Sequence, residues 1–181
     1  MPTVTAYDKA PRVSGSVAQA ATERVIQIRR ISKVTAGGKT LRFNALVAMG
    51  DGHGHVGIGL GKADAVPDAV RKGVAVAQKN MIRVPMKNAT IPHEVLSKFR
   101  ASKVLLKPAV PGTGVVAGAT IRAIMELAGI RDILTKSLGN PNPINLSKAT
   151  MEALATLQSP KVDVMEQNDD SISIVGEEKS I

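Results

Sequence analysis

Two glycine patterns in the chain could bind the phosphate groups of a cofactor or a substrate. The first, Gly52-x-Gly54-x-x-Gly57, matches the pattern of dinucleotide-binding loops. That chemistry requires the glycines to join a strand to a helix, so that the pyrophosphate lies at the helix N-terminus. Here the glycines join two expected strands, and the next expected helix begins only after Lys62. We therefore predict that the chain binds no dinucleotide cofactor.

The second pattern, Pro111-Gly112-Thr113-Gly114, precedes an expected helix and is a better candidate for a phosphate site. The amides of such a loop converge where the helix dipole is positive, which favours an anion. The loop resembles the phosphate loop of the small-molecule kinases called GHMP kinases, which have a similar βα layout. Serines follow the glycines in those kinases, whereas Val115 and Val116 follow here. A structural turn or a contact to a neighbouring chain is favoured, and a small-molecule kinase is the alternative.

The histidines and acids of the chain offer little else for catalysis. His53 and His55 lie two residues apart in an expected turn, far from His93 in the sequence, and the chain has no cysteine to complete a metal site. We interpret His53 and His55 as exposed turn residues near phosphate. No pair of carboxylates has the spacing of a general acid and base. The sequence therefore predicts no catalytic residue, no metal site, no cofactor and no small-molecule substrate.

A short basic segment is the strongest functional signal. Five cations lie within fourteen residues, with no acid among them: Arg29, Arg30, Lys33, Lys39 and Arg42. They surround Gly37 and Gly38, a pair that supplies the positive φ a tight reversal needs. A hairpin of this kind can enter a groove and spread its cations over several phosphates, and arginine can bind them bidentately. The segment predicts contact with RNA.

The charge of the whole chain supports a polyanionic partner. The net charge is +9 over 181 residues, but residues 161–181 carry −4, so residues 1–160 carry +13. A folded region this basic attracts nucleic acid, because each phosphate it neutralises releases condensed counterions. Hydrophobic residues make up 44% of the chain, enough for a core. There is no membrane-length apolar run and no secretory signal, so we expect a cytoplasmic protein; an organellar one is less favoured.

Hydrophobic periodicity predicts two small units. In the first, strands over 25–34, 41–49 and 56–60 precede a helix from Val66 to Ala77 that Asp64 is expected to cap. From Leu41 to Met49 alternate residues are expected to face the core and the solvent. The third strand carries glycine at 57, 59 and 61 on one face, which allows a helix or another backbone to approach closely.

The second unit is expected to be β-β-α-β-α. Its strands cover 90–100, 103–107 and 130–138, and its helices cover 115–128, with Gly129 as C-cap, and 145–157. The fold class is thus α+β with two small domains. We divide the chain into a flexible arm (1–22), an N-terminal RNA-binding domain (23–86), a C-terminal βα domain (87–158) and an acidic disordered tail (159–181).

Several motifs then resemble one known family. The run from Gly38 to Gly59 (GKTLRFNALVAMGDGHGHVGIG) is similar to the signature of the fifth protein of the small ribosomal subunit. Further motifs follow in the same order as in that family: Gly61-Lys62-Ala63, Val66-Pro67, Gly112-Thr113-Gly114, Ala128-Gly129 and Asn142-Pro143-Ile144-Asn145. The resemblance covers residues 24–157. It departs at Ala65, where the family usually carries glutamate.

The resemblance implies a fold and a set of partners. It implies an N-terminal β-β-β-α domain similar to double-stranded-RNA-binding domains, a C-terminal domain of the GHMP-kinase type, and a place where the head and body of the small subunit meet, near the point at which mRNA enters. Its implied partners are small-subunit rRNA and the fourth and eighth small-subunit proteins, with a role in assembly and decoding accuracy. The loop from Val34 to Lys39 would reach into rRNA. A free-standing regulator that binds double-stranded RNA is a further alternative.

The predicted contact residues form two sets. The candidate RNA-binding residues are Arg24, Arg29, Arg30, Lys33, Gly37, Gly38, Lys39, Arg42, His53, His55 and Lys62. The candidate protein-interface residues, near the fourth protein, are Gly112, Thr113, Gly114 and Arg122.

Overall fold

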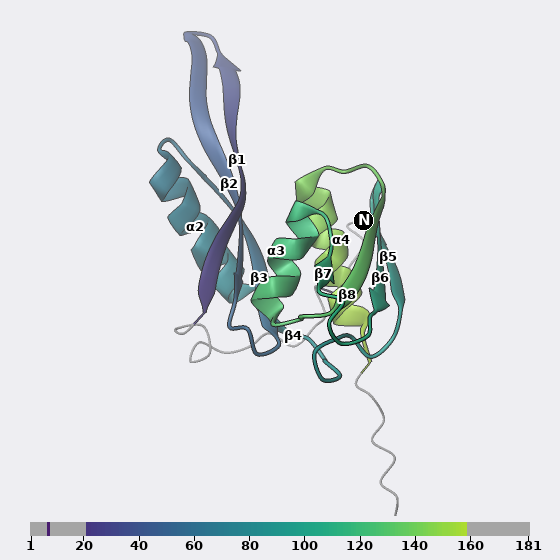
Figure 1. Ribbon diagram of the computed structural model, residues 1–181. Coiled ribbons are helices and arrows are strands. Elements are labelled where there is room, and N and C mark those ends of the chain that lie inside the picture. Colours follow the sequence, from purple (N-terminus) through teal and green to yellow (C-terminus); the bar gives the residue numbers. More distant parts are fainter. Residues whose placement is uncertain (1–6, 8–20, 159–181) are drawn as a thin grey trace, which may run out of the picture.

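Two four-stranded sheets form the frame of the protein (Figure 1). The computed structural model describes residue 7 and residues 21–158. The strand order is β1-β2-β3-β4 in the first sheet and β5-β6-β8-β7 in the second. Helices pack on both sheets, so the predicted α+β class is confirmed. No helix in the described part of the chain is long and apolar enough to cross a membrane.

The first sheet begins with a long hairpin. Strand β1 (Thr22–Thr35) and strand β2 (Gly38–Gly50) are joined by the two-residue turn Ala36-Gly37. Gly38 supplies the positive φ that the reversal was predicted to need, +130°, and Gly37 does not adopt one. The tip of the hairpin extends past the helices and is visible at the top of Figure 1.

The rest of the first unit is β3 (His55–Ala63), α2 (Val66–Lys79) and the short β4 (Ile82–Arg83), which pairs with β3 and was not predicted. Asp64 does not cap α2. The N-cap is Ala65, whose side chain makes no capping hydrogen bond, and Asp64 instead pairs with Arg42, with Oδ1 2.8 Å from Nε. Pro67 in the first turn, with its fixed φ and missing N–H, favours a helix start without a side-chain cap.

The glycine face of β3 holds α2 in direct backbone contact, as the sequence predicted. A Cβ atom built on Gly59 would lie 2.0 Å from the carbonyl oxygen of Gly73, and one on Gly61 would lie 1.9 Å from that of Ala69. A Cβ atom on Gly57 would lie 2.3 Å from the carbonyl oxygen of Ala77. Three glycines on alternate residues therefore remove the layer of side chains that normally separates a helix from a sheet.

Strand β2 is buried on both faces, which contradicts the expected alternation. Ala45 and Val47 pack under α2, but Leu46 and Ala48, on the other face, are also buried. Ala48 belongs to a large core cluster that includes Ile124 and Met125 of the second unit. The second unit covers the face that the pattern assigned to solvent. Only the outer part of β2, up to Arg42, is exposed as a hairpin.

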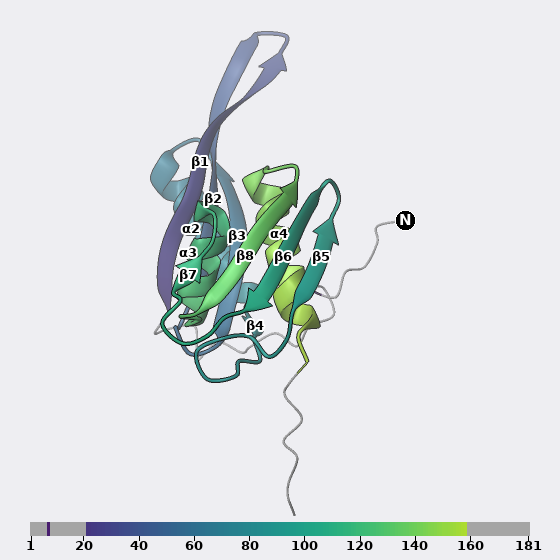
Figure 2. The same ribbon diagram turned by 45° about the vertical axis from the view of Figure 1, so that its right-hand side comes forward.

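The second unit contains β5 (Val95–Phe99), β6 (Ser102–Pro108), β7 (Val115–Val116), α3 (Ala119–Ala128), β8 (Ile133–Gly139) and α4 (Pro143–Thr156). Val115 and Val116 were expected in the helix but form a parallel strand with β8, because α3 begins only after Gly118. Gly129 ends α3 with φ +87°, as predicted. Both helices lie behind one face of the sheet (Figure 2).

The two units are joined through the loop between β2 and β3. The amides of Gly52 and Gly54 donate to the carbonyl oxygens of Leu127 and Ala128 at the end of α3, each at 2.9 Å. This contact explains the glycine-rich loop that resembled a dinucleotide site. The division into domains at residue 86 stays a proposal. The proposed tail lies outside the described residues, as does the proposed arm apart from Tyr7, Ala21 and Thr22; the Tyr7 hydroxyl donates to the carbonyl oxygen of Asn80 at 3.0 Å.

Candidate nucleic-acid interface

The cations of the hairpin divide between its two faces. In an antiparallel pair, residues directly opposite each other carry their side chains on the same face. Arg29 is opposite Asn44, Ile31 is opposite Arg42, and Lys33 is opposite Thr40. Arg29, Lys33 and Arg42 therefore share one face, which is the face directed away from α2.

Strand β3 adds a fourth cation to that face. Lys62 is opposite Asn44 on the other side of β2, so Arg29, Asn44 and Lys62 form one row across three strands. Arg29 and Lys62 are exposed, whereas Asn44 between them is 9% exposed. We call the residues Arg29, Lys33, Arg42 and Lys62 the cationic face. Three strands present it as a rigid surface, which favours binding of several phosphates at fixed spacing.

The opposite face of the hairpin is more apolar. It carries Arg30 and Lys39, with Leu41 between these two cations and Val34 directly opposite Lys39. Val34 is 70% exposed and Leu41 is 51% exposed. The five predicted cations therefore all lie on the hairpin, but they are divided between its two faces and do not form one surface. The positions of Gly37 and Gly38 at the tip are as predicted, and no atom lies within 4 Å of a Cβ built on either.

Two of the predicted RNA-binding arginines are already paired within the chain. Arg24 forms an ion pair with Glu126 of α3, which ties β1 to the second unit. Arg42 pairs with Asp64, but both side chains are more than half exposed, so this pair stabilises the fold little and phosphate can compete for it. Within the described residues, Arg29, Lys33 and Lys62 make no ion pair.

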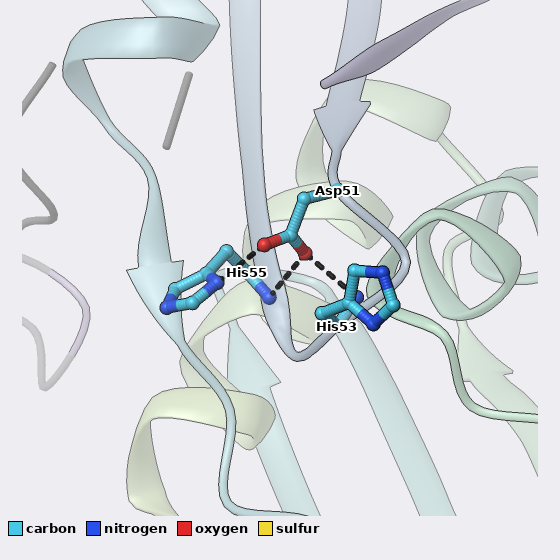
Figure 3. A network of polar contacts seen from close by, with 3 residues as sticks. All are labelled: Asp51, His53 and His55. Atoms are coloured by element: carbon cyan, nitrogen blue, oxygen red, sulfur yellow. Dashed lines mark hydrogen bonds and ion pairs between the residues drawn. The ribbon is translucent and has the colours of Figure 1, made fainter. Parts of the chain in front are cut away.

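The predicted turn histidines differ from each other (Figure 3). The carboxylate of Asp51 accepts the backbone N–H of His53 at 2.8 Å and that of His55 at 3.0 Å. The His55 ring is also held, with Nδ1 2.6 Å from Oδ2 of Asp51. His55 is 20% exposed at its side chain, so the expectation of an exposed ring was wrong for it. His53 is exposed, as expected.

Asp51 fixes the loop that joins the two units. Burial raises the pKa of this carboxyl, but the hydrogen bonds from the His53 and His55 amides and the interaction with the His55 ring outweigh burial and lower the pKa below its usual 3.8. The ionised form is thus the one that the fold stabilises. It holds the turn in which the Gly52 and Gly54 amides reach the end of α3.

We expect Asp51→Asn to lower the free energy of unfolding by about 1.5–3 kcal/mol at pH 7, because it weakens hydrogen bonds to a charged group. The pKa of Asp51 is lower in the folded protein, so the stabilisation is present above pH 3.8 and is lost as the pH falls through the folded pKa. Urea titrations at pH 7 and pH 3 give the free energy of unfolding at each pH. Its decrease from pH 7 to pH 3 should be smaller for the variant than for the unchanged protein. An equal decrease in the two proteins would contradict this role of Asp51.

The loop predicted as a phosphate or protein contact is occupied by a side chain of the protein itself. Oδ1 of Asp132, which is 7% exposed, accepts the amide of Gly112 at 3.0 Å and that of Gly114 at 2.9 Å. Thr113 turns back onto Val110, with both its amide and its hydroxyl donating to that carbonyl oxygen. The internal carboxylate takes the amides that a phosphate would need. This arrangement speaks against the kinase alternative.

Arg122, the fourth residue of the predicted protein interface, lies beside the same loop. Its guanidinium donates to the carbonyl oxygen of Val115 at 3.3 Å, and its side chain is exposed. Gly112 and Thr113 are exposed as well. The loop therefore presents a preformed surface whose backbone is fixed from inside by Asp132. Among the residues that the structure describes, no three His, Cys, Asp or Glu side chains gather as a metal site would require.

Sequence reasoning missed the two carboxylates that shape these loops. Asp51 stands at the start of a Gly-His-Gly-His run, and an aspartate at such a position commonly hydrogen-bonds amides two residues ahead, so a signal was present. Asp132 lies about twenty residues beyond the loop that it binds, and nothing in the spacing connects them. Asn44 at the centre of the cationic row was assigned to solvent, because the strand was expected to have one wet face.

Comparison with known proteins gives a consistent result across both units. A family model described as the N-terminal domain of ribosomal protein S5 matches residues 21–85, and one described as its C-terminal domain matches residues 97–168. The chain is 56% identical to the small ribosomal subunit protein uS5 of Chloroflexus aurantiacus over 137 residues, which are 76% of this chain and 77% of that protein. It is 56% identical to that of Thermotoga maritima over 139 residues, 77% and 78% of the two chains. The hairpin and the Gly112–Gly114 loop both lie within the matched regions.

Proposed function

This chain belongs to the ribosomal protein S5 family, and from that premise we propose that it is a structural constituent of the small ribosomal subunit that binds rRNA through the cationic face. Its relatives are named as ribosomal proteins, a non-enzymatic family. The observation that carries the proposed contact is the row Arg29–Asn44–Lys62 with Lys33 beyond it. These exposed cations have no ion pair within the described part of the chain.

The hairpin is suited to rRNA by its shape as well as by its charge. Its outer part extends past α2, so both of its faces can contact RNA when the hairpin enters an RNA groove. Most contacts between proteins and nucleic acid go to phosphate and sugar, and cations on a rigid sheet fix the register of such contacts. On the other face, Val34 and Leu41 lie next to the cations Arg30 and Lys39 and can contact sugar edges. We propose that the tip residues Gly37 and Gly38 enter rRNA.

The finer parts of the proposal concern position and partners. We propose that the protein lies where the head and body of the subunit meet, near the point at which mRNA enters, and that it supports assembly and accurate decoding. The loop Gly112–Gly114 with Arg122 is then the contact to the fourth small-subunit protein, and the eighth is a second neighbour. A backbone held by Asp132 supports a contact of defined shape. The cytoplasmic ribosome is the proposed location.

A sedimentation experiment tests the proposed function. The tagged chain, produced in a bacterium, should sediment with the small subunit through a gradient at about 0.5 M salt, because several phosphate contacts and protein neighbours hold it there. A free-standing RNA regulator would dissociate as its counterion-dependent contacts weaken. Recovery of the chain only at the top of the gradient, with intact subunits below, would contradict a structural role.

A further inference from the structure

The outer face of the second sheet is uncovered in the described part of the chain. Helices α3 and α4 pack on the inner face, as Figure 2 shows from the open side. The outer side chains of β5, β6 and β8 alternate lysine with aliphatic residues, and β7 adds Val116. We call this surface the Lys/Leu face; it comprises Leu96, Lys98, Lys103, Leu105, Lys107, Val116, Leu134, Lys136 and Leu138.

The charges of the Lys/Leu face are not balanced within the described residues. Lys98 of β5 lies directly opposite Lys103 of β6, a like-charge pair that destabilises an isolated sheet. Lys107 is paired with Glu94, with Nζ 3.1 Å from Oε2. Lys98, Lys103 and Lys136 form no ion pair in the part of the chain that the structure describes. An anionic occupant would relieve the repulsion of the opposed lysines.

The exposed aliphatic side chains indicate which class of molecule could bind this face. Leu96 is 61% exposed, Val116 48%, Leu134 41% and Leu138 38%. Within the described residues, this face carries no exposed aromatic side chain. Bases therefore have no stacking platform of the kind that RNA-binding sheets use. A row of half-exposed aliphatic side chains between lysines fits a polypeptide that carries both acids and aliphatic residues.

The C-terminal segment of this chain has that composition. Residues 159–181 contain six acids and only two lysines, and the aliphatic run Ile172-Ser173-Ile174-Val175 stands between Asp169-Asp170 and Glu177-Glu178. The serine and isoleucine residues alternate, as in a strand with one apolar face. The segment therefore matches the Lys/Leu face both in charge and in its aliphatic content.

The segment is also long enough to reach this face. Helix α4 packs against β5, the edge strand, and Leu157 shares the core cluster with Val95 at the start of β5. An extended chain spans about 3.3 Å per residue, so residues 159–181 can reach roughly 70 Å, whereas four strands are only about 15 Å wide. A tethered segment within such reach has an effective concentration in about the millimolar range.

We propose that the acidic C-terminal segment covers the Lys/Leu face, with its carboxylates on Lys98, Lys103 and Lys136 and its aliphatic residues on the exposed leucines. The edge strand β5 is the nearest part of the face to the end of α4. In the free protein, this contact shields a cationic and apolar surface from other polyanions. It does not depend on the function proposed above, because it concerns the chain alone.

Carbodiimide crosslinking of the full chain tests the proposal. This reagent joins a carboxylate to an amine only where the two are in contact. At low protein concentration we expect crosslinks from Asp169, Asp170, Glu177 or Glu178 to Lys98, Lys103 or Lys136, located by mass spectrometry. They should disappear at high salt, and also in the variant Lys98→Gln with Lys103→Gln and Lys136→Gln.

A second measurement keeps the result independent of crosslinking chemistry. In a full-length variant with Asp169, Asp170, Glu177 and Glu178 changed to the corresponding amides, acetylation of Lys98, Lys103 and Lys136 should become several-fold faster. Acetylation of Lys72 and Lys79 on α2 should be unchanged and serves as the internal control. Crosslinks to Lys33, Lys39 or Lys62 instead, crosslinks that increase with protein concentration, or unchanged acetylation would each overturn the proposal. Protection of these lysines only when an rRNA fragment is added would assign the face to RNA and would also overturn it.

Discussion

Gly61→Ala should cost the protein about 3 kcal/mol or more of its free energy of unfolding. The φ of Gly61 lies outside the left-handed region, so alanine is not strained by its backbone angles there, and the effect is steric. The new Cβ would lie 1.9 Å from the carbonyl oxygen of Ala69 and 2.4 Å from the amide nitrogen of Gly73. Both are backbone atoms of α2, so the whole helix must move away from β3. Urea unfolding followed by circular dichroism measures this loss.

Gly37→Ala is the matched control for this experiment. Gly37 also lacks a positive φ, but no atom lies within 4 Å of its Cβ position, at the open tip of the hairpin. We expect a change within about 0.5 kcal/mol, as for most exposed positions. If Gly61→Ala were as stable as Gly37→Ala, the direct contact between α2 and the glycine face would be contradicted.

Neutralising the cationic face should weaken rRNA binding by about 100-fold or more. The variant combines Arg29→Gln, Lys33→Gln and Lys62→Gln, three cations that make no ion pair within the described residues. If each contributes about 1 kcal/mol to contacts with phosphate, the three together account for about two orders of magnitude in affinity. Arg42 is left unchanged because its loss would also free Asp64. Filter binding of an rRNA fragment at fixed salt concentration gives the dissociation constants of the variant and of the unchanged protein.

A control variant carries the same change of charge on a different element. Arg71→Gln, Lys72→Gln and Lys79→Gln remove one arginine and two lysines from the exposed side of α2. Arg71 pairs with Asp68 at 3.1 Å, but both side chains are more than half exposed, so the loss of this pair changes stability little. If only the net charge of the protein mattered, the two variants would bind rRNA equally weakly. We expect the α2 variant to lose less than about tenfold, because non-specific attraction alone is reduced.

The parts of the fold that local pattern determines could be predicted from the sequence. The hairpin follows from cations and β-branched residues around Gly37-Gly38, and α2 follows from apolar residues at a spacing of three and four. The close approach of α2 to β3 followed from three glycines on one strand face. The C-cap at Gly129 followed from glycine's access to the left-handed region.

The remaining features depend on contacts between distant parts of the chain. Leu46 and Ala48 are buried by the second unit, and no local pattern reports a second covering layer. Val115 and Val116 leave the helix because β8 offers them a parallel partner. The amides of Gly112 and Gly114 bind Asp132, which is distant in sequence. The sequence shows which cations the hairpin carries, but their division between two faces depends on the register that the two-residue turn imposes.

The salt dependence of rRNA binding tests the central claim most directly. The slope of the logarithm of the binding constant against the logarithm of salt concentration reports how many phosphates the protein neutralises, with about 0.7–0.9 per contact. If the cationic face binds phosphates, the variant without Arg29, Lys33 and Lys62 should have a slope smaller in magnitude by about 2–3, while the α2 variant keeps the slope of the unchanged protein. Equal slopes for the cationic-face variant and the unchanged protein would contradict the claim that this face binds rRNA.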